Sequence, residues 1–348
     1  MTRTRDTTTS DLFADPFGER SKMQELPPMN LLGARFVFKS NSSRLLRLAA
    51  QAFARLPAHR LSAHAPRLEL SLLLTPKRRL VRAARLEPPP LQMLSGSGYL
   101  IGAPESANFV CLSPAERRGV VTVSETMLRY PYHTRYELLE FAVYTLASRC
   151  QGLVSLHAAC IARAGRGILL MGESGAGKST ITLHSLLQGF DIISEDSVFV
   201  QPRTLKATGL ANFLHITEDS LHWVARARDV AAIRKAPVIQ RRSGAKKYEV
   251  NLRHGSFRLA ASPVTIVAVV FLSAQRGVRG ELLEALSKSD LSDRMSDAQA
   301  YAANQPHWSL FERAVARRGA FVLRRGAHPR DSVEALAAIV DSTQSSTG

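Results

Sequence analysis

Between residues 31 and 130 the apolar positions come in short runs that Pro and Gly interrupt. Residues 43–56 have apolar side chains at helical spacing and are followed by Pro57, so we expect an amphipathic helix that ends there. Apolar runs that favour strands lie at residues 68–74, 99–101 and 109–112. The pattern predicts a mixed α+β region in this part of the chain.

From residue 136 onward the runs are longer and alternate regularly. Residues 137–149 repeat apolar side chains on a helical period, which is typical of a buried helix. The next segments predict a strand, a second strand, a helix and a third strand, at residues 153–161, 167–171, 178–188 and 190–193. Residues 264–272 are almost purely apolar and β-branched, which predicts a strand buried on both faces of a sheet.

The C-terminal part continues the alternation. We expect a helix over residues 290–304, a short strand over 320–323, and a last helix through Val340 that Asp331 or Ser332 can cap. The pattern as a whole predicts a disordered tail over 1–30, a smaller mixed α+β region over 31–130, and an α/β domain with a helix-flanked sheet over 131–348.

Charge adds a second feature to the first region. The 348-residue chain is 45% hydrophobic, enough for a core, and its net charge is +17. Twelve Lys or Arg fall between Arg35 and Arg85, against one acid, Glu69. A basic surface attracts nucleic acid, an anionic membrane face or an acidic protein, but it also serves solubility, and charge alone leaves both interpretations open. A nucleic-acid partner is the weakest of these, because no nucleic-acid-binding motif accompanies the charge.

The cysteines and the N-terminal residues give indications of the cellular compartment. Cys111, Cys150 and Cys160 fit no zinc or redox motif, and an odd number disfavours a disulfide framework. The first residues lack the apolar stretch of a secretory signal, and no apolar run reaches the roughly 18 residues of a membrane-spanning helix. We therefore expect a cytoplasmic protein without a membrane span. A homo-oligomer stays open.

A glycine-rich loop stands between the strand predicted at 167–171 and the helix predicted at 178–188. Its residues are Gly172, Glu173, Ser174, Gly175, Ala176, Gly177, Lys178 and Ser179, followed by Thr180. Glycines let backbone N–H groups converge on phosphates, and the positive end of the following helix faces the same anion. Lys178 can reach the β- and γ-phosphates, and the Ser179 hydroxyl can ligate magnesium. This stretch predicts a P-loop that binds ATP with Mg²⁺.

Two acids, Glu195 and Asp196, follow the next predicted strand, and Asp196 lies 18 positions after Lys178 (196 − 178). If that strand is the parallel neighbour of the strand before the loop, the carboxylates lie beside the phosphates, because ligands bind at the carboxyl edge of such sheets. A carboxylate there can hold magnesium or accept a proton from a hydroxyl. The alternative is an acidic turn at an exposed strand end. The spacing disfavours a transporter-type ATPase, and a guanine-reading motif of small GTPases is absent from the sequence.

Two further features give weaker signals. His157 lies on the strand before the loop, where a lone histidine is more often a core or hydrogen-bonded residue than a catalyst. Residues 241–247, Arg-Arg-Ser-Gly-Ala-Lys-Lys, can lie over the phosphates or grip a substrate, although such a segment is more often a solvated loop.

Three stretches taken together resemble the C-terminal kinase domain of the HPr kinase/phosphorylase family: residues 156–159 (Leu-His-Ala-Ala), 172–179 and 194–197 (Ser-Glu-Asp-Ser). They are more similar still to the HPr-kinase-like bacterial proteins found beside peptide-modifying systems, including lasso-peptide serine kinases. The resemblance is good over residues 136–215 and looser over the rest of the C-terminal half. It implies a P-loop kinase that transfers the γ-phosphate of ATP to a Ser or Thr hydroxyl of a protein or peptide, with His157 in its active site.

The resemblance places the family's Asp pair, whose first member is the general base, on Glu195 and Asp196. Residues 206–209 read Lys-Ala-Thr-Gly where the family has Glu-Ile-Arg-Gly, so phosphorylase activity and HPr as acceptor are not expected. Successive side chains at a strand end point to opposite sides. We therefore expect Asp196 and Ser179 to organise magnesium and Glu195 to face the acceptor hydroxyl, although the sequence leaves open which acid is the base.

The leading hypothesis is thus a kinase whose catalytic residues are Glu195, Asp196, His157 and Lys178. The alternative from another class is a nucleotide-binding module that hydrolyses ATP slowly and uses its basic N-terminal surface to hold a partner protein or peptide.

Overall fold

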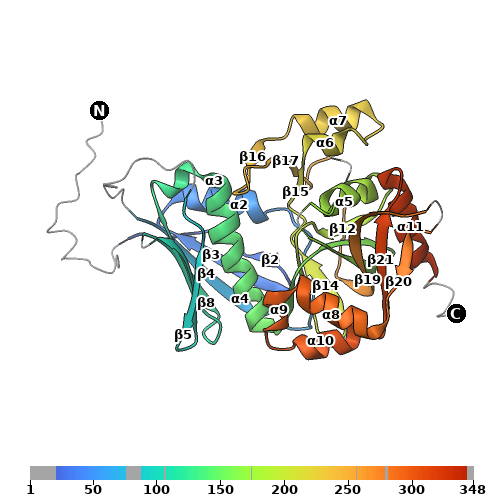
Figure 1. Cartoon of the computed structure of the whole chain (residues 1–348). Helices are drawn as coiled ribbons and strands as arrows, with labels where there is room; N and C mark the ends of the chain where they lie inside the picture. The colour runs from blue at the N-terminus through green and yellow to red at the C-terminus, as the bar shows by residue number, and fades with distance from the viewer. Residues whose placement is uncertain are drawn as a thin grey trace.

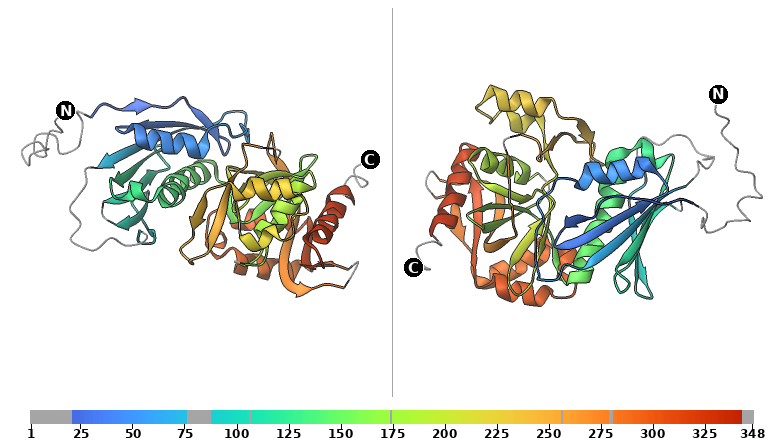
Figure 2. Two further views of the ribbon diagram at one scale, coloured as in Figure 1. Left: turned by 90° about the horizontal axis from the view of Figure 1, so that it is seen from above. Right: turned by 180° about the vertical axis from the view of Figure 1, so that it is seen from behind.

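The structure is a computed structural model that describes residues 21–75, 88–105, 107–173, 175–255, 257–278 and 281–342. It contains two mixed sheets, each covered by helices, and a small third sheet that stands above the junction between them (Figures 1 and 2). The prediction of a mixed α/β fold is confirmed.

The N-terminal sheet has eight strands in the order β1-β3-β4-β8-β7-β6-β5, with β2 paired to β3. Their bounds are β1 Gln24–Glu25, β2 Met29–Leu31, β3 Ala34–Ser40, β4 Arg67–Thr75, β5 Gln92–Gly96, β6 Tyr99–Glu105, β7 Asn108–Ser113 and β8 Arg118–Ser124. The predicted helix is α2 (Ser43–Phe53), which joins the parallel strands β3 and β4. Strands β1 and β2 correct the expectation of a tail that reaches residue 30, and residues 1–20 lie outside the described part of the chain.

The helical segment before the second sheet belongs to the core of the first. It consists of η1 (Met127–Arg129), α3 (Pro131–His133), η2 (Thr134–Glu140) and α4 (Phe141–Gln151). The side chains of Leu138, Ala142 and Leu146 are fully buried in one cluster with Phe36, Leu70 and other residues of the N-terminal sheet. Burial of this face is the main force that places the helix there. We call the N-terminal sheet together with this helical segment, up to Gly152, the N-terminal unit, while the domain boundary expected at 131 stays a prediction.

The C-terminal sheet has ten strands, with β18-β12-β10-β11-β19-β14-β13-β9 in order and β21 between β19 and β20. The strands are β9 Val154–His157, β10 Ala159–Arg163, β11 Arg166–Met171, β12 Asp191–Ser194, β13 Ser197–Val200, β14 Lys206–Gly209, β18 Arg258–Leu259, β19 Val264–Arg276, β20 Leu283–Ala285 and β21 Gly319–Arg325. The helices are α5 Lys178–Leu187, α8 Lys288–Ala298, α9 Ala300–Ala303, α10 Trp308–Val315 and α11 Pro329–Ser342. Side chains of β19 enter the clusters on both faces, as predicted for residues 264–272.

The third sheet has three strands in the order β15-β17-β16: β15 Phe213–Ile216, β17 Lys246–Asn251 and β16 Val238–Gln240. With α6 (Glu218–Leu221) and α7 (Ala227–Arg234) it forms the yellow lobe at the top of Figure 1. Its apolar face packs against α5 through a cluster that includes Leu183, Leu214 and Ile233. The cation-rich segment 241–247 connects β16 to β17, and its Arg242 side chain reaches Glu137 of η2.

Three expected elements have different limits. The strand predicted over 153–161 is broken at Ala158 into β9 and β10, which lie at different places in the sheet. The helix predicted over 290–304 is broken at Gln299. The last helix begins at Pro329, and the carboxylate of Asp331 accepts a hydrogen bond from the His328 backbone N–H at 2.9 Å, so Asp331 stabilises the helix start from within the first turn.

Candidate functional site

The glycine-rich loop joins β11 to α5. The backbones of Gly175 and Gly177 have φ angles of +87° and +102°, a conformation that other residues seldom adopt, and α5 begins at the next residue, Lys178. The Lys178 ammonium donates to the carbonyl oxygens of Gly172 and Glu173. Burial lowers the pKa of Lys178, and Asp196 and Glu195 partly oppose that shift. Ser174 lies outside the described residues.

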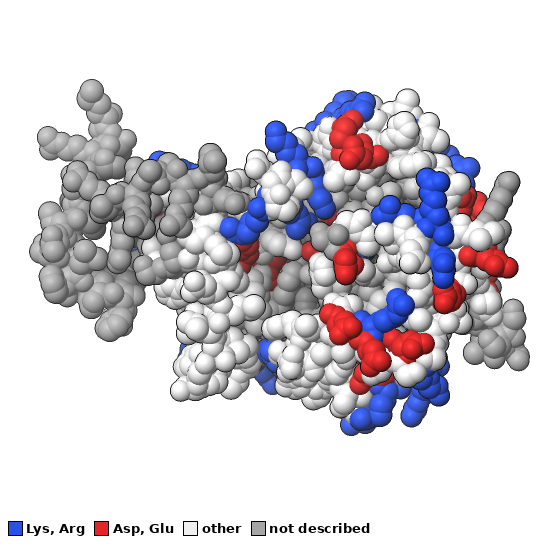
Figure 3. All heavy atoms as spheres, in the orientation of Figure 1, with Lys and Arg blue, Asp and Glu red and all other residues white. Residues whose placement is uncertain are grey.

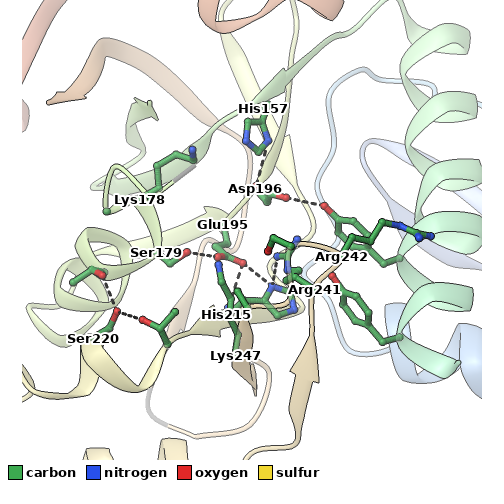
Figure 4. Close-up of a pocket in the computed structure, with 18 of the residues that line it drawn as sticks. His157, Lys178, Ser179, Glu195, Asp196, His215, Ser220, Arg241, Arg242 and Lys247 are labelled. Carbon is green, nitrogen blue, oxygen red and sulfur yellow. Dashed lines mark hydrogen bonds and ion pairs between the residues drawn. The ribbon is translucent and has the colours of Figure 1, made fainter. Parts of the chain in front are cut away.

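Glu195 is the acid that contacts this loop. The Ser179 hydroxyl donates a 2.6 Å hydrogen bond to Glu195 Oε1 (Figure 4). The second carboxylate oxygen, Oε2, lies 3.0 Å from Nδ1 of His215, and the Glu195 side chain is only 7% exposed. No hydrogen bond joins the side chains of Asp196 and Ser179, and our expectation that the two share a metal stays a prediction. Strand β12 is also not the neighbour of β11, because β10 lies between them.

Asp196 faces the other side, toward His157. His157 Nδ1 lies 3.2 Å from Asp196 Oδ1, and the Tyr136 hydroxyl donates to Asp196 Oδ2 at 2.9 Å (Figure 4). Burial favours the neutral acid, but the nearby His157, the Tyr136 hydrogen bond and Arg241 outweigh it and hold the pKa of Asp196 below its usual value. Asp196 is thus an ionised carboxylate with one neighbour from each large unit.

The backbone of His157 is fixed from two sides. Strand β9 pairs with β13 so that His157 lies opposite Ser197, the residue after Asp196. The Gln299 side chain accepts a hydrogen bond from His157 N at 2.8 Å and donates one to His157 O at 2.9 Å. The break between α8 and α9 is what allows Gln299 to reach this strand. The His157 ring itself is 59% exposed and borders the cavity.

Behind Glu195 runs a set of buried charged residues that the sequence analysis missed. We call His215, Glu249, Arg135 and Glu140 the buried ion chain. His215 Nε2 lies 3.2 Å from Glu249 Oε1, and the Arg135 guanidinium donates to both oxygens of Glu249. Arg135 Nε lies 3.6 Å from Glu140, which also accepts a 2.9 Å hydrogen bond from Asn212. Each of the four side chains in the buried ion chain is less than a tenth exposed.

The pairing shifts the pKa values along this chain. Burial would raise the pKa of Glu249, but His215 and Arg135 lower it to about 2. Burial would lower the pKa of His215, yet its bonds to Glu195 and Glu249 raise it above the usual value. A histidine with a carboxylate at each ring nitrogen is held in the protonated form, in which both nitrogens donate. The protonated His215 ring therefore places a positive charge beside the Glu195 carboxylate.

These groups surround one cavity of about 580 Å³. Residues of the loop and of β9, with the two acids, form one side, and residues from α3, η2 and the 241–247 segment form the other. Expected residues that line it are His157, Glu173, Gly175, Gly177, Lys178, Ser179, Thr180, Glu195 and Asp196. Gly172 and Ala176 are not among its lining residues.

The cation-rich segment makes two kinds of contact. The guanidinium of Arg241 stacks over the Tyr136 ring at 5.3 Å and lines the cavity, as does Lys247. Arg242 also borders the cavity, and it donates to the Glu137 carboxylate and to the carbonyl oxygen of Pro89 at 3.0 Å. The segment thus contributes charge to the cavity and also ties the third sheet to the N-terminal unit.

None of the described cations of the basic region, Arg35–Arg85, lines this cavity. Five of its twelve cations, between residues 77 and 85, lie outside the described part. Of the others, Lys39 pairs with Glu69 at 2.9 Å and Arg44 pairs with Glu125 at 2.8 Å. On the face drawn in Figure 3, Lys and Arg atoms form several separate groups. A partner for this region stays a prediction.

The described residues lack two features that would indicate other kinds of protein. No cluster of three or more His, Cys, Asp or Glu side chains placed to hold a metal ion occurs among them. Magnesium held by one hydroxyl, one carboxylate and the phosphates of a substrate needs no such cluster. No helix in the same part of the chain is long and apolar enough to cross a bilayer.

Comparison with known proteins gives little further information. No family model matches the chain, and no curated protein matches it. Among solved structures, that of the Hpr(Ser) kinase/phosphatase from Coxiella burnetii aligns with 55% of this chain and 95% of its own, at 10% sequence identity and a TM-score of 0.28. This likeness is loose and assigns no role to any residue of the cavity.

Proposed function

We propose that the chain is a kinase that transfers the γ-phosphate of ATP, bound with Mg²⁺ on the loop 172–180, to a Ser or Thr hydroxyl of a protein or peptide. The observation that carries the proposal is the placement of Glu195 and Asp196. One carboxylate bonds to Ser179 of the loop, while the next faces the open cavity beside His157. A second ionised carboxylate in front of the loop can orient a hydroxyl toward the γ-phosphate, which nucleotide binding alone does not require.

The loop side supplies the phosphate and metal ligands. The N–H groups around Gly175 and Gly177 and the start of α5 offer positive potential to the phosphates. Lys178 would exchange the loop carbonyls for phosphate oxygens when ATP binds. Ser179 and Glu195 present hard oxygens 2.6 Å apart and fit magnesium. The ion, when bound, would neutralise charge on the β- and γ-phosphates.

Asp196 is the residue that we assign to the acceptor. The acceptor oxygen forms a bond to the γ-phosphorus, the bond from that phosphorus to the bridging oxygen of ADP breaks, and the hydroxyl proton passes to Asp196. A carboxylate of lowered pKa is a weak base, but in a loose phosphoryl-transfer transition state its main task is to orient the hydroxyl. His157 and Tyr136 hold the carboxylate in place for that task.

The acceptor class follows from the resemblance of residues 156–159, 172–179 and 194–197 to HPr-kinase-like proteins. The test is to incubate the chain with γ-labelled ATP, Mg²⁺ and peptides encoded by neighbouring genes. We expect label on a Ser or Thr of one peptide with the wild-type chain and none with Asp196→Asn. Hydrolysis of ATP without label on any peptide would favour the slow ATPase module instead.

A further inference from the structure

A second cavity, of about 310 Å³, also borders the glycine-rich loop. It shares four lining residues with the first cavity: Gly175, Gly177, Thr180 and Ser220. Its other walls come from α6, the ends of β19 and β21, and the start of α11. The Arg325 guanidinium lies 3.5 Å from the carbonyl oxygen of Gly175, so the end of β21 contacts the glycine-rich loop. The two cavities therefore meet across the segment that we assign to phosphates.

The chemistry of this second cavity differs from that of the first. Its lining includes the apolar side chains of Ile181, Leu272 and Leu323. Trp223 is 40% exposed and lies at its edge, with its ring 5.4 Å from that of His328 at an angle of 88°. Arg276 and Arg325 lie among the same lining residues. A flat aromatic side chain, apolar walls and nearby cations suit a planar heterocycle attached to phosphate.

We infer that this cavity binds the purine ring of the nucleoside triphosphate, with Trp223 as its stacking partner. The inference depends on the proposed function, because the loop must hold the phosphates that lead into it. Phosphates on the loop then extend from the nucleoside on the Trp223 side to the γ-phosphate on the Asp196 side. The acceptor cannot use the Trp223 side, since its hydroxyl must meet Asp196 in the first cavity. Two cavities that border the loop thus receive the two substrates.

The experiment compares two ligands that share the phosphates and differ in the base. Dissociation constants of ATP and of inorganic triphosphate, each with Mg²⁺, are measured by calorimetry for the wild-type chain and for Trp223→Ala. We expect ATP to bind roughly ten- to a hundredfold more weakly to the variant, while inorganic triphosphate binds unchanged. Trp223→Phe should keep most of the ATP affinity. Tyr99→Ala removes an equally exposed ring, 44% exposed, at a distant hairpin and should change neither ligand.

Fluorescence gives a second readout that does not depend on the stability of Trp223→Ala. The chain has two tryptophans, and Trp308 is buried at 8% exposure. In Trp308→Phe, ATP should quench the remaining emission and inorganic triphosphate should not.

The outcomes separate the two proposals. Equal losses for both ligands in Trp223→Ala, or no loss for either, would overturn the base pocket. Inorganic triphosphate that binds the wild-type chain as tightly as ATP would overturn it too, while the phosphate loop would stand. If the wild-type chain binds neither ligand, both the nucleotide proposal and the base pocket are wrong.

Discussion

The two sides of the main cavity are built in different ways. The loop wall comes from two nearby stretches of the chain: Glu173, Gly175 and residues 177–180 of the loop, and Glu195 with Asp196. The far wall comes from the N-terminal unit and the third sheet, and the buried ion chain backs it. Its lining residues include Tyr132, His133, Tyr136, Glu137, His215 and members of the segment 241–247. The loop wall carries groups that can contact ATP and its acceptor, whereas the far wall carries charges that hold Glu195 and Asp196 in place.

This difference predicts that changes in the two walls have different readouts. Loss of a loop-wall group should reduce phosphate transfer in a chain that still folds. Loss of a buried charge in the far wall should first reduce stability, because the partner charge is left unpaired and out of water.

Asp196→Asn should have the largest effect on transfer. The amide keeps the shape of the side chain but can no longer accept the acceptor proton, so we expect the transfer rate to fall by about 10²–10⁴. ATP affinity should stay close to wild type, since Asp196 contacts His157 and Tyr136 and not the loop. Single-turnover transfer and equilibrium ATP binding measure the two quantities. A normal transfer rate would remove Asp196 from the reaction.

Lys178→Ala should have the second largest effect on the rate of phosphate transfer. The variant loses the ammonium that we assign to the β- and γ-phosphates, and loss of one such group typically reduces turnover by about 10²–10³. Unlike Asp196→Asn, this change should also weaken ATP binding. Calorimetric titration with ATP and Mg²⁺, together with the rate of γ-phosphate release, provides the measurement. Wild-type affinity and turnover in the variant would contradict the role of the loop.

Glu249→Gln tests the far wall. It leaves Arg135 and His215 without their shared carboxylate in a buried place, and we expect a loss of about 3–5 kcal/mol in the free energy of unfolding at neutral pH. Denaturant unfolding gives this value. The control is Glu218→Gln, which breaks the exposed ion pair of Glu218 with Arg234 and should change stability far less. Equal, small effects of both changes would show that the buried ion chain does not stabilise the fold.

The pH dependence of stability gives a smaller and more specific signal. The pKa of His215 is raised in the folded chain, where Glu195, Glu249 and Arg241 face its ring. Its stabilising effect is complete below the unfolded pKa of about 6.5 and is lost as pH rises through the folded pKa, by at most about 1.4 kcal/mol per pH unit. The free energy of unfolding should therefore fall above pH 6.5 more steeply in wild type than in His215→Gln. Parallel pH profiles would contradict a protonated His215.

The loop wall could be predicted from the sequence because its residue types and short spacing are themselves the signal. The far wall could not, because Arg135 and Glu249 lie 114 positions apart and buried charges have no local pattern that separates them from surface charges. Strand alternation indicated that Glu195 and Asp196 face different partners, but not which partner each one faces. That choice depends on the sheet order, in which β10 separates β12 from β11.

The fold was predictable to a similar degree. The apolar period located most helices and strands, including α2, α5 and the doubly buried β19. It missed the breaks at Ala158 and Gln299, because these depend on contacts of the backbone with distant residues: Ala158 N donates to Asp196 O at 3.1 Å, and Gln299 bonds to His157. It also predicted a buried helix at residues 137–149, but periodicity does not show against which sheet a buried helix packs.

The most direct test of the account is the magnesium dependence of ATP binding in Glu195→Gln and Asp196→Asn. Glu195 contacts Ser179 and Asp196 does not, so the account predicts that Glu195→Gln raises the magnesium concentration needed for half-maximal ATP binding by about tenfold or more. Asp196→Asn should leave that concentration nearly unchanged while it reduces transfer. The reverse result, a higher magnesium requirement in Asp196→Asn and a normal one in Glu195→Gln, would contradict the division of roles between the two acids.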